Sequence, residues 1–470
     1  DVLPQIEPPL ALQADSIRID GLKVVQEGES VIDVRTARGG LNAASGRLHV
    51  ERLRVDSDRG QFALHGDYEP RKDFRTDLVA TAVLPAPTGR TAPRLGLVAK
   101  GDLSRMDVAV AGRLPAPTQA TLTLRGDKDS PRWHVRARSQ ALDLGLLTGS
   151  TEASEPLAFD VDAHGTGGNA NVSGKIAQGE FSAVVQPSKL SLVDRRLQLQ
   201  PLVVDLFDGR VTANGIADLR DPKDASLKFA VNARGLHWRS ADGKTDVGGD
   251  ADFGLAGKPE RWALKGQARL QRGNERATVD VTGNGFRDRM QVTALRAGMP
   301  QGRLDASGEI AWSPRLSWTA KATLAGFDPG YFAPDWPGAV NGMVLFSGVR
   351  RDNGSLLADV EASNLGGTLR GRALRGRGTL NIDGDNYAGD VALSLGGSRI
   401  DARAKIAAGI DIEANLSPLQ LDDLLPDGRG SMRGMFALRG ARTAPGVDIG
   451  LRGEGVACGD YRAEQFIAKG

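Results

Sequence analysis

The chain of 470 residues is 40% apolar but only 5% aromatic, and it carries a formal net charge of +2 with a single cysteine. A chain with this apolar content and so little net charge is not a disordered chain. The small charge gives no bulk attraction to nucleic acid or to an anionic membrane, and one cysteine excludes an internal disulfide and a cysteine metal cluster.

The first ten residues, DVLPQIEPPL, are acidic and rich in proline, which is not the pattern of a signal peptide. No stretch approaches the ~18 continuous apolar residues of a membrane span. The chain ends in a strand-like segment, FIAKG, and we expect it to be a piece of a longer protein, whose anchor and end cap lie outside it.

Short alternating segments begin near the N-terminus and continue along the whole chain. Residues 17–19, 48–50 and 62–64 are early examples, with apolar and polar residues in strict alternation. Such runs predict half-buried β-strands. The sequence LPAPT occurs twice, at 84–88 and 114–118, and we expect both copies at edges or in loops because proline cannot donate to a β-ladder.

One predicted hairpin recurs further along the chain. LHVERLRVDSDRGQFALHG at 48–66 aligns without a gap with LQLQPLVVDLFDGRVTANG at 197–215. The tail of this unit returns at 302–308 as GRLDASG. A unit that recurs in fixed order is the mark of a repeat architecture.

A second repeat is found in the C-terminal third of the chain. Leu324–Gly348 aligns with Leu416–Gly440 without a gap, at an offset of 92 residues. Each copy predicts a strand end, one helical turn, a Pro-Asp turn, a glycine and a further strand. The segment at 141–156, ALDLGLLTGSTEASEP, is interpreted as a degenerate third copy.

The apolar strand faces must be covered without long helices, because no helical period longer than about two turns is present. Two sheets can pair face to face, or one sheet can curl around its own apolar side, and both solutions are all-β. The inward residues are mostly small aliphatics, which fit either simple packing or an open groove. About 30–35 strands at about 4.8 Å would extend an open sheet to roughly 150 Å.

The domain organisation predicted from these repeats is one continuous, elongated β-repeat region over residues 1–470. The repeats and their spacing divide it into loose sub-units at 1–140, 141–236, 237–324, 325–415 and 416–470.

The sequence carries none of the common motifs for catalysis or metal binding. Neither H-E-x-x-H nor G-x-S-x-G occurs, and the five histidines never fall at ligand spacing or beside a plausible Asp/Glu/Cys set. We therefore expect no catalytic residue, no metal ligand, no cofactor and no enzymatic activity. Arg370, Arg372, Arg375 and Arg377 fit a basic patch or, as the simpler interpretation, the solvated face of a hairpin.

One stretch resembles a known family. FAPDWPGAVNGMVLFSG at 332–348, preceded by SWTAKATLAGFDPG, resembles the Trp-Pro-Gly region of the TamB family within the wider AsmA-like group. The GRVTANG and GRLDASG hairpins and the LDLGLL and LQLDDLL turns look like the repeating elements of the same family. The resemblance is specific around 316–348 and 416–440, and it places this chain in the middle portion of such a protein.

The resemblance implies a fold, a location and partners. Proteins of this family form a long curled β-sheet, a taco-like trough with a hydrophobic groove and few helical turns. They reach through the periplasm of Gram-negative bacteria from an inner-membrane helix to an outer-membrane barrel partner, TamA. They are associated with phospholipid transport to the outer membrane and with outer-membrane biogenesis. No nucleic-acid partner is implied.

A passive mechanism fits the residues and the resemblance: acyl chains lie on apolar strand faces while head groups stay in water. We predict a path lined by Phe229, Val231, Phe253, Leu255, Val279, Val281, Trp318, Leu393, Leu395, Ile410 and Ile412. The main alternative is a scaffold or chaperone for the β-strands of outer-membrane clients. A β-solenoid adhesin with a dry, closed core is a third possibility.

Overall fold

The computed structural model describes residues 11–26, 29–127, 130–148, 155–240, 246–351, 354–425, 427–458 and 461–470. The chain divides into two compact units, Asp1–Pro222 and Lys223–Gly470. Both are built almost entirely of β-strands.

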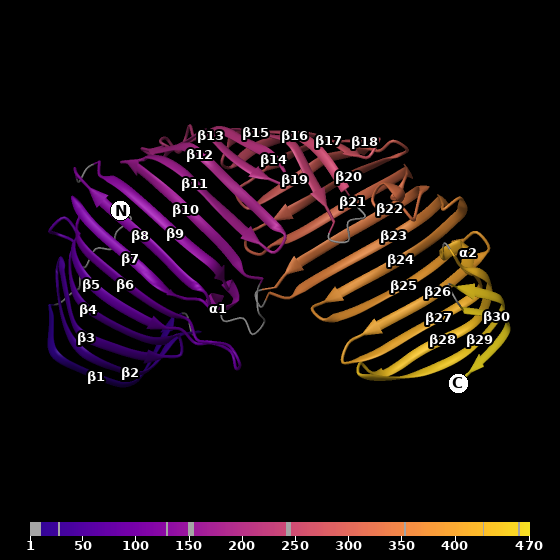
Figure 1. Ribbon diagram of the computed structural model, residues 1–470, viewed down its shortest axis with the longest axis horizontal. Helices are drawn as coiled ribbons and strands as arrows, with labels where there is room; N and C mark the ends of the chain where they lie inside the picture. The colour runs from indigo at the N-terminus through magenta and orange to yellow at the C-terminus, as the bar shows by residue number, and fades with distance from the viewer. Residues whose placement is uncertain are drawn as a thin grey trace. The chain divides into compact units, whose positions relative to one another are not determined.

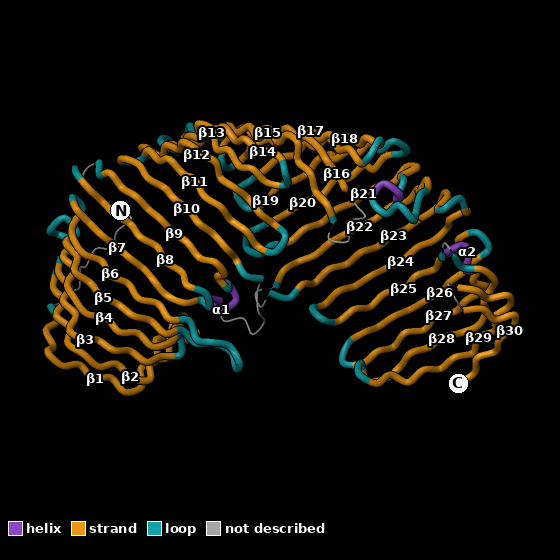
Figure 2. The backbone as a smooth tube through the Cα atoms, in the orientation of Figure 1, coloured by secondary structure: helices purple, strands orange, loops and turns teal. Residues whose placement is uncertain are grey.

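The first unit is an antiparallel meander in which each strand pairs with the next (Figure 1). Its one described α-helix, α1 (Leu144–Thr148), lies between the ninth and tenth strands (Figure 2). The strands are β1 (Leu12–Gln26), β2 (Glu29–Ala44), β3 (Arg47–Ser57), β4 (Gly60–Glu69), β5 (Arg75–Val83), β6 (Arg94–Asp102), β7 (Arg105–Arg113), β8 (Pro117–Arg125), β9 (Arg132–Leu142), β10 (Leu157–Thr166), β11 (Asn169–Gln178), β12 (Phe181–Val193), β13 (Arg196–Leu206) and β14 (Gly209–Asp218).

The second unit continues the same pattern, with two short helical elements, η1 (Pro329–Tyr331) and α2 (Leu421–Leu424). Consecutive strands again pair antiparallel. They are β15 (Ser226–Arg239), β16 (Asp246–Lys258), β17 (Arg261–Arg272), β18 (Glu275–Gly285), β19 (Arg289–Gly298), β20 (Arg303–Ala311), β21 (Ser317–Phe327), β22 (Gly338–Arg350), β23 (Leu356–Leu369), β24 (Arg372–Asp383), β25 (Asn386–Leu395), β26 (Ser398–Ile406), β27 (Gly409–Gln420), β28 (Arg429–Ala441), β29 (Ala444–Cys458) and β30 (Tyr461–Lys469).

These elements confirm the all-β prediction. In each unit the described strands form one open antiparallel layer, so the sheet is not closed by pairing of its first and last strands. Consecutive hairpins produce this order because each tight turn places a strand beside the one before it. None of the described helices is long and apolar enough to cross a membrane.

The two predicted repeats share backbone detail as well as sequence. The hairpins β3–β4 and β13–β14 carry bulges at aligned positions, Val50/Leu53 and Leu199/Leu202. A β-bulge bends its strand and increases the local twist, so its place is a designed feature of the sheet. This repeated bend confirms that one hairpin type has been reused.

The repeat at 324–348 and 416–440 is confirmed in the same way. Bulges fall at Leu324/Phe327 and at Leu416/Leu419, again 92 residues apart. Each bulge is followed by a helical turn, η1 in the first copy and α2 in the second. Pro426 of the second copy lies outside the described residues, as do 149–154 of the degenerate copy, which keeps its turn as α1.

The LPAPT copies lie where proline is tolerated. Residues 84–88 form the irregular connection between β5 and β6. In the second copy Pro115 makes only an isolated bridge to Leu142, and Pro117 is the first residue of β8. Both placements avoid a missing donor inside a ladder, as expected.

Candidate functional site

The apolar face of the second unit is continuous from β15 to β29. Side chains of directly paired residues lie side by side on one face, so partners form rows that cross the strands. Two rows consist only of aliphatic, aromatic and glycine residues. The first contains Phe229, Leu255, Leu264, Gly283, Val292, Gly308, Ala320, Phe346, Val360, Leu380, Gly389, Ala404, Ile412, Leu438 and Val447; the second contains Val231, Phe253, Gly266, Val281, Leu295, Ala306, Ala322, Val344, Ala362, Gly378, Val391, Ala402, Ala414, Phe436 and Ile449.

We call these two rows the floor. At about 4.8 Å per strand, each row extends over roughly 70 Å of sheet. Large floor side chains remain in contact with solvent: Phe253 is 38% exposed, Phe346 40%, Leu380 41% and Val391 39%. Adjacent exposed apolar side chains on one face mark a binding surface rather than a core.

A third row lies beside the first floor row, on the side away from the second floor row. It begins at Leu227 on β15, reaches Pro445 on β29, and contains no charged side chain. The apolar face is therefore wider than the floor alone.

Rings in the third row lie against glycines of the next strand. Trp262 is paired with Gly285, and Trp318 with Gly348. A Cβ atom at Gly285 would come within 1.9 Å of the Trp262 ring, and one at Gly348 within 2.4 Å of the Trp318 ring. Only glycine leaves this space, so each ring lies down on the sheet instead of standing up from it. The apolar surface stays smooth despite its large side chains.

One border of the apolar face is covered, and we call this covered border, with η1, α2 and Trp336, the rim. Val340, Leu374 and Leu395 are only 1–6% exposed there and form a buried cluster. Trp336, from the loop after η1, and Leu424, from α2, pack against that cluster. The helical turn of each repeat thus supplies a lid over one edge of the strands.

The buried carboxylate of Asp423 in α2 holds this helix against strands β24 and β26. Asp423 is 2% exposed and accepts hydrogen bonds from the Gly397 amide at 3.0 Å and the Ser398 hydroxyl at 2.8 Å. The Nε of Arg372 lies 3.2 Å from the same carboxylate. A buried charge is tolerated when it is paired and hydrogen-bonded in this way.

Arg370 completes the fastening of the rim. It donates to the Asp423 carbonyl oxygen at 3.3 Å, and its guanidinium lies 5.5 Å from the centre of the Trp336 ring. Arg370 and Arg372 are therefore structural contacts of the rim. Their clustering in the sequence does not by itself make a basic binding patch.

The first unit carries a comparable apolar row. It crosses β4 to β14 through Leu64, Ala80, Leu97, Val110, Ala120, Ala137, Val161, Gly174, Val185, Val204 and Val211. All of these residues are partly buried, and none is a large ring. The two units thus present the same kind of apolar surface.

The eleven residues predicted to line a lipid path all lie on the apolar face of the second unit. Ten belong to rows that are only partly covered, and Leu395 lies in the buried cluster of the rim. By row, they are Phe229, Leu255 and Ile412 on the first floor row; Val231, Phe253 and Val281 on the second; Trp318 and Ile410 on the third row; and Val279 and Leu393 on the rim side of the floor.

The opposite face of the sheet is polar. A cleft of about 840 Å³ opens there over β15 to β18, and His237, Asp250, Arg269 and Arg276 are among its lining residues. Leu236, Leu270 and Ala277 line the cleft as well, so its lining is mixed. Its charged groups do not suit an acyl chain, because burying unpaired polar groups against hydrocarbon is unfavourable. The cleft therefore adds nothing to the apolar face.

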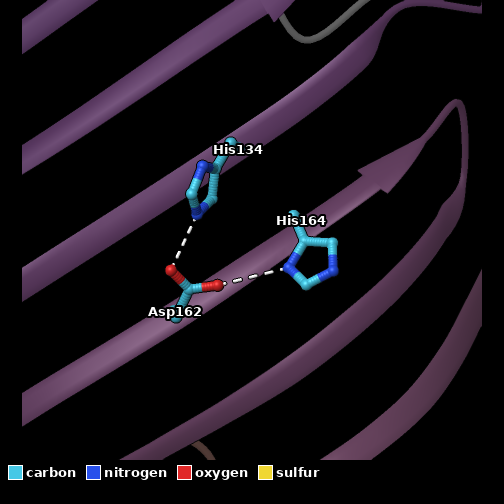
Figure 3. Close-up of side chains that lie close together, drawn as sticks. All are labelled: His134, Asp162 and His164. Atoms are coloured by element: carbon cyan, nitrogen blue, oxygen red, sulfur yellow. Dashed lines mark hydrogen bonds and ion pairs between the residues drawn. The ribbon is translucent and has the colours of Figure 1, made fainter.

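Two histidines and one aspartate meet on the polar face of the first unit (Figure 3). His134 on β9 lies directly opposite His164 on β10. The Nε2 of His134 is 2.7 Å from one Asp162 oxygen, and the Nδ1 of His164 is 3.2 Å from the other. The hydrogen bond from His134, together with those from Arg136 and His164, holds the pKa of Asp162 well below its usual range.

The expectation that no histidine lies beside a plausible Asp/Glu/Cys set is wrong, because His134, Asp162 and His164 form one. Besides this cluster, His49 lies 2.8 Å from Asp67 and His237 lies 2.9 Å from Asp246. Sequence spacing hid these contacts because strand pairing joins residues that are 28 positions apart for His134 and Asp162, 18 for His49 and Asp67, and 9 for His237 and Asp246. The one local signal was the D-x-H pattern at 162–164, which puts both side chains on one face of a strand.

The fold and this face define the class: an open, single-layer repeat β-sheet with an uncovered apolar side. Residues 209–470, more than half of the chain, match the family model described as TamB, N-terminal domain. The chain belongs to the TamB family.

A curated relative has also been found. The chain is 22% identical over 194 residues to the translocation and assembly module subunit TamB of Haemophilus influenzae. That match covers 41% of this chain and 15% of the relative, so it spans only a small part of that longer protein. No solved structure matches the chain.

Proposed function

We propose that this chain is a segment of a lipid-conducting bridge in the periplasm of a Gram-negative bacterium, and that phospholipids pass along its apolar face. The observation that carries the proposal is the floor, which is apolar from β15 to β29 and is left uncovered by the described residues. Membership of the TamB family supports it, because the related protein is a subunit of a translocation and assembly module.

The chemistry of the floor favours passive movement. Each buried CH₂ group of an acyl chain contributes about 0.8 kcal/mol, so a two-chain lipid is held by surface contact alone. The floor rows carry no charged or hydrogen-bonding side chain that would fix a lipid at one place. Head groups remain in water, and the lipid slides without a catalytic step.

The rim gives the path a border. Because η1, α2 and Trp336 cover one edge of the apolar face, an acyl chain on the floor is shielded from water on that side. The parent protein would reach the outer membrane through a barrel partner such as TamA and the inner membrane through its own anchor. Both links are part of the proposal.

The first experiment is native mass spectrometry of the purified chain, with extraction and identification of bound lipid. Co-purifying phospholipid in more than one copy per chain is the expected result. A stable, monodisperse chain without lipid would contradict lipid conduction and favour a scaffold that pairs with client β-strands.

A matched pair of double variants then tests the face. Val281→Asp with Leu393→Asp puts charges on the apolar side of β18 and β25, and we expect loss of bound lipid and of transfer between vesicles. Thr282→Asp with Ser394→Asp changes the next residue of the same strands, on the polar face. Equal lipid transfer by the two folded double variants would overturn the proposal.

A further inference from the structure

We propose that His134, Asp162 and His164 form a binding site for a divalent transition-metal ion such as Zn²⁺. The three side chains come from β9 and β10, two neighbouring strands of the first unit, and lie close together (Figure 3). Strand alternation puts them on the face opposite the apolar row through Ala137 and Val161. The site is therefore independent of lipid binding.

The geometry needs little change to accept an ion. One ligand atom from each side chain lies within 4.8 Å of the others. The donors of a four-coordinate Zn²⁺, at about 2.1 Å from the metal, are about 3.4 Å apart. Small side-chain rotations close that difference, because the two histidine rings are already 5.7 Å apart and nearly perpendicular.

The pairing of β9 and β10 holds the ligand side chains in position before an ion binds. His134 and His164 are a directly opposed cross-strand pair, and Asp162 lies two residues before His164 on the same face. Opposed residues of an antiparallel pair have Cβ atoms about 4.5–5.5 Å apart, so the sheet itself holds both rings at the site.

The donor set selects the kind of ion. Two imidazole nitrogens and one carboxylate oxygen suit Zn²⁺, Cu²⁺ or Ni²⁺ better than Mg²⁺ or Ca²⁺, which prefer all-oxygen sites. The side chains are 57% exposed at His164, 35% at His134 and 30% at Asp162, so an ion can enter from solvent. Water completes the coordination.

One cation competes for the carboxylate. The Nε of Arg136 lies 2.7 Å from the Asp162 oxygen that also contacts His134. The Arg136 side chain is 70% exposed, so it can turn into solvent when a metal takes that oxygen. Removing this competitor should therefore tighten metal binding.

The ion would act as a clip between β9 and β10. These strands are joined at one end by residues 143–156, whereas His134 and His164 lie near the opposite, unjoined end of the pair. A metal at that end would hold both strands in register. Binding to the folded state alone stabilises that state by mass action.

The test is isothermal titration of the untagged chain with Zn²⁺ and, in parallel, absorption spectroscopy with Co²⁺, whose visible band reports tetrahedral coordination by nitrogen and oxygen. We expect one ion per chain and a Co²⁺ band. His134→Gln and Asp162→Asn should each weaken binding at least about tenfold, and Arg136→Gln should strengthen it.

The chain offers a control. His49→Gln removes a histidine that also pairs with an aspartate, Asp67, but has no second histidine in the cluster. It should leave binding unchanged. Absence of saturable Zn²⁺ binding, or equal binding by the His134→Gln and His49→Gln variants with native circular dichroism, would overturn the proposal.

Discussion

The rim and the floor share strands, yet one is a closed core and the other is open to solvent. Strand β25 shows both within five residues. Val391 is 39% exposed on the floor, Leu393 is partly buried, and Leu395 is 1% exposed in the rim. All three point to the same face, so the alternating pattern fixes the face while separate segments decide whether it is covered.

The covering segments are short. Trp336, from the loop after η1, and Leu424, from α2, pack over the rim cluster, and these two segments interrupt the meander after β21 and β27. The other fully described connections between strands of this unit are only two to five residues long, so they supply few side chains that could cover the sheet. Stability is therefore concentrated at the rim, and exposed apolar surface at the floor.

The largest effect should come from removing a rim side chain. Leu395→Ala leaves a cavity in the buried cluster and should cost about 2–5 kcal/mol. Val391→Ala on the same strand and face should cost less than about 1 kcal/mol, because that side chain is already in contact with solvent. Hydrogen exchange of the β25 and β26 amides measures both; equal losses would abolish the distinction between rim and floor.

The next effect concerns the fastening of α2. Asp423→Ala leaves the Gly397 amide without its acceptor and takes away one of the two acceptors near the Ser398 hydroxyl, the other being the Gln420 carbonyl oxygen at 3.2 Å. The loss should cost about 1–3 kcal/mol in the same exchange measurement. Asp422 is the matched control: it pairs with Arg372 at 2.7 Å but is 49% exposed. Asp422→Ala should cost under about 1 kcal/mol.

If Asp422→Ala and Asp423→Ala destabilised β26 equally, burial of the carboxylate would not be what holds the rim. Attraction between Arg372 and the two carboxylates, buried or not, would then be what holds α2 in place.

A third effect tests the smoothness of the apolar face. Gly285→Ala places a methyl group where the Trp262 ring lies, so the ring must lift from the sheet. We expect a cost of about 1 kcal/mol, at the low end for overpacking because the ring can tilt away, together with weaker lipid binding. Gly254→Ala is the control, since the nearest atom to its added methyl group lies 4.0 Å away.

Should the two glycine variants bind lipid equally, raised rings would be no obstacle, and the pairing of rings with glycines would serve stability alone. Exchange of the β17 and β18 amides separates these two roles.

Much of this arrangement followed from the sequence. The strands, the reused hairpin and the 92-residue repeat were predicted because period-2 alternation and glycine-marked turns are local signals. Phe229, Val281 and Ile412 were assigned to the apolar face on the same grounds, and the structure places them there.

What could not be predicted depended on register and on tertiary cover. Leu395 has the same sequence context as Leu393, and only the packing of α2 and Trp336 separates them. His134 meets Asp162 because β9 and β10 pair in one particular register, and a shift of a single residue would place them on opposite faces.

The smallest expected effect belongs neither to the rim nor to the floor. It concerns an ion pair between exposed residues. The pKa of Asp218 is lowered to about 2, mainly by the hydrogen bond from Arg220, whose nitrogen lies 2.6 Å from the carboxylate. Because the folded-state pKa lies below the ordinary 3.8, this contact stabilises the fold above about pH 4, and the contribution is lost as the pH falls toward 2.

Arg220→Gln should return the pKa of Asp218 toward 3.8, as seen by NMR titration of its carboxyl carbon, and should remove that part of the acid dependence. Arg220→Lys keeps the charge without the planar fork and should fall between the two. Neither should alter stability at neutral pH as much as Asp423→Ala, because solvent screens an exposed pair. A loss at neutral pH as large as that of Asp423→Ala would mean that surface ion pairs, rather than the rim, hold this sheet together.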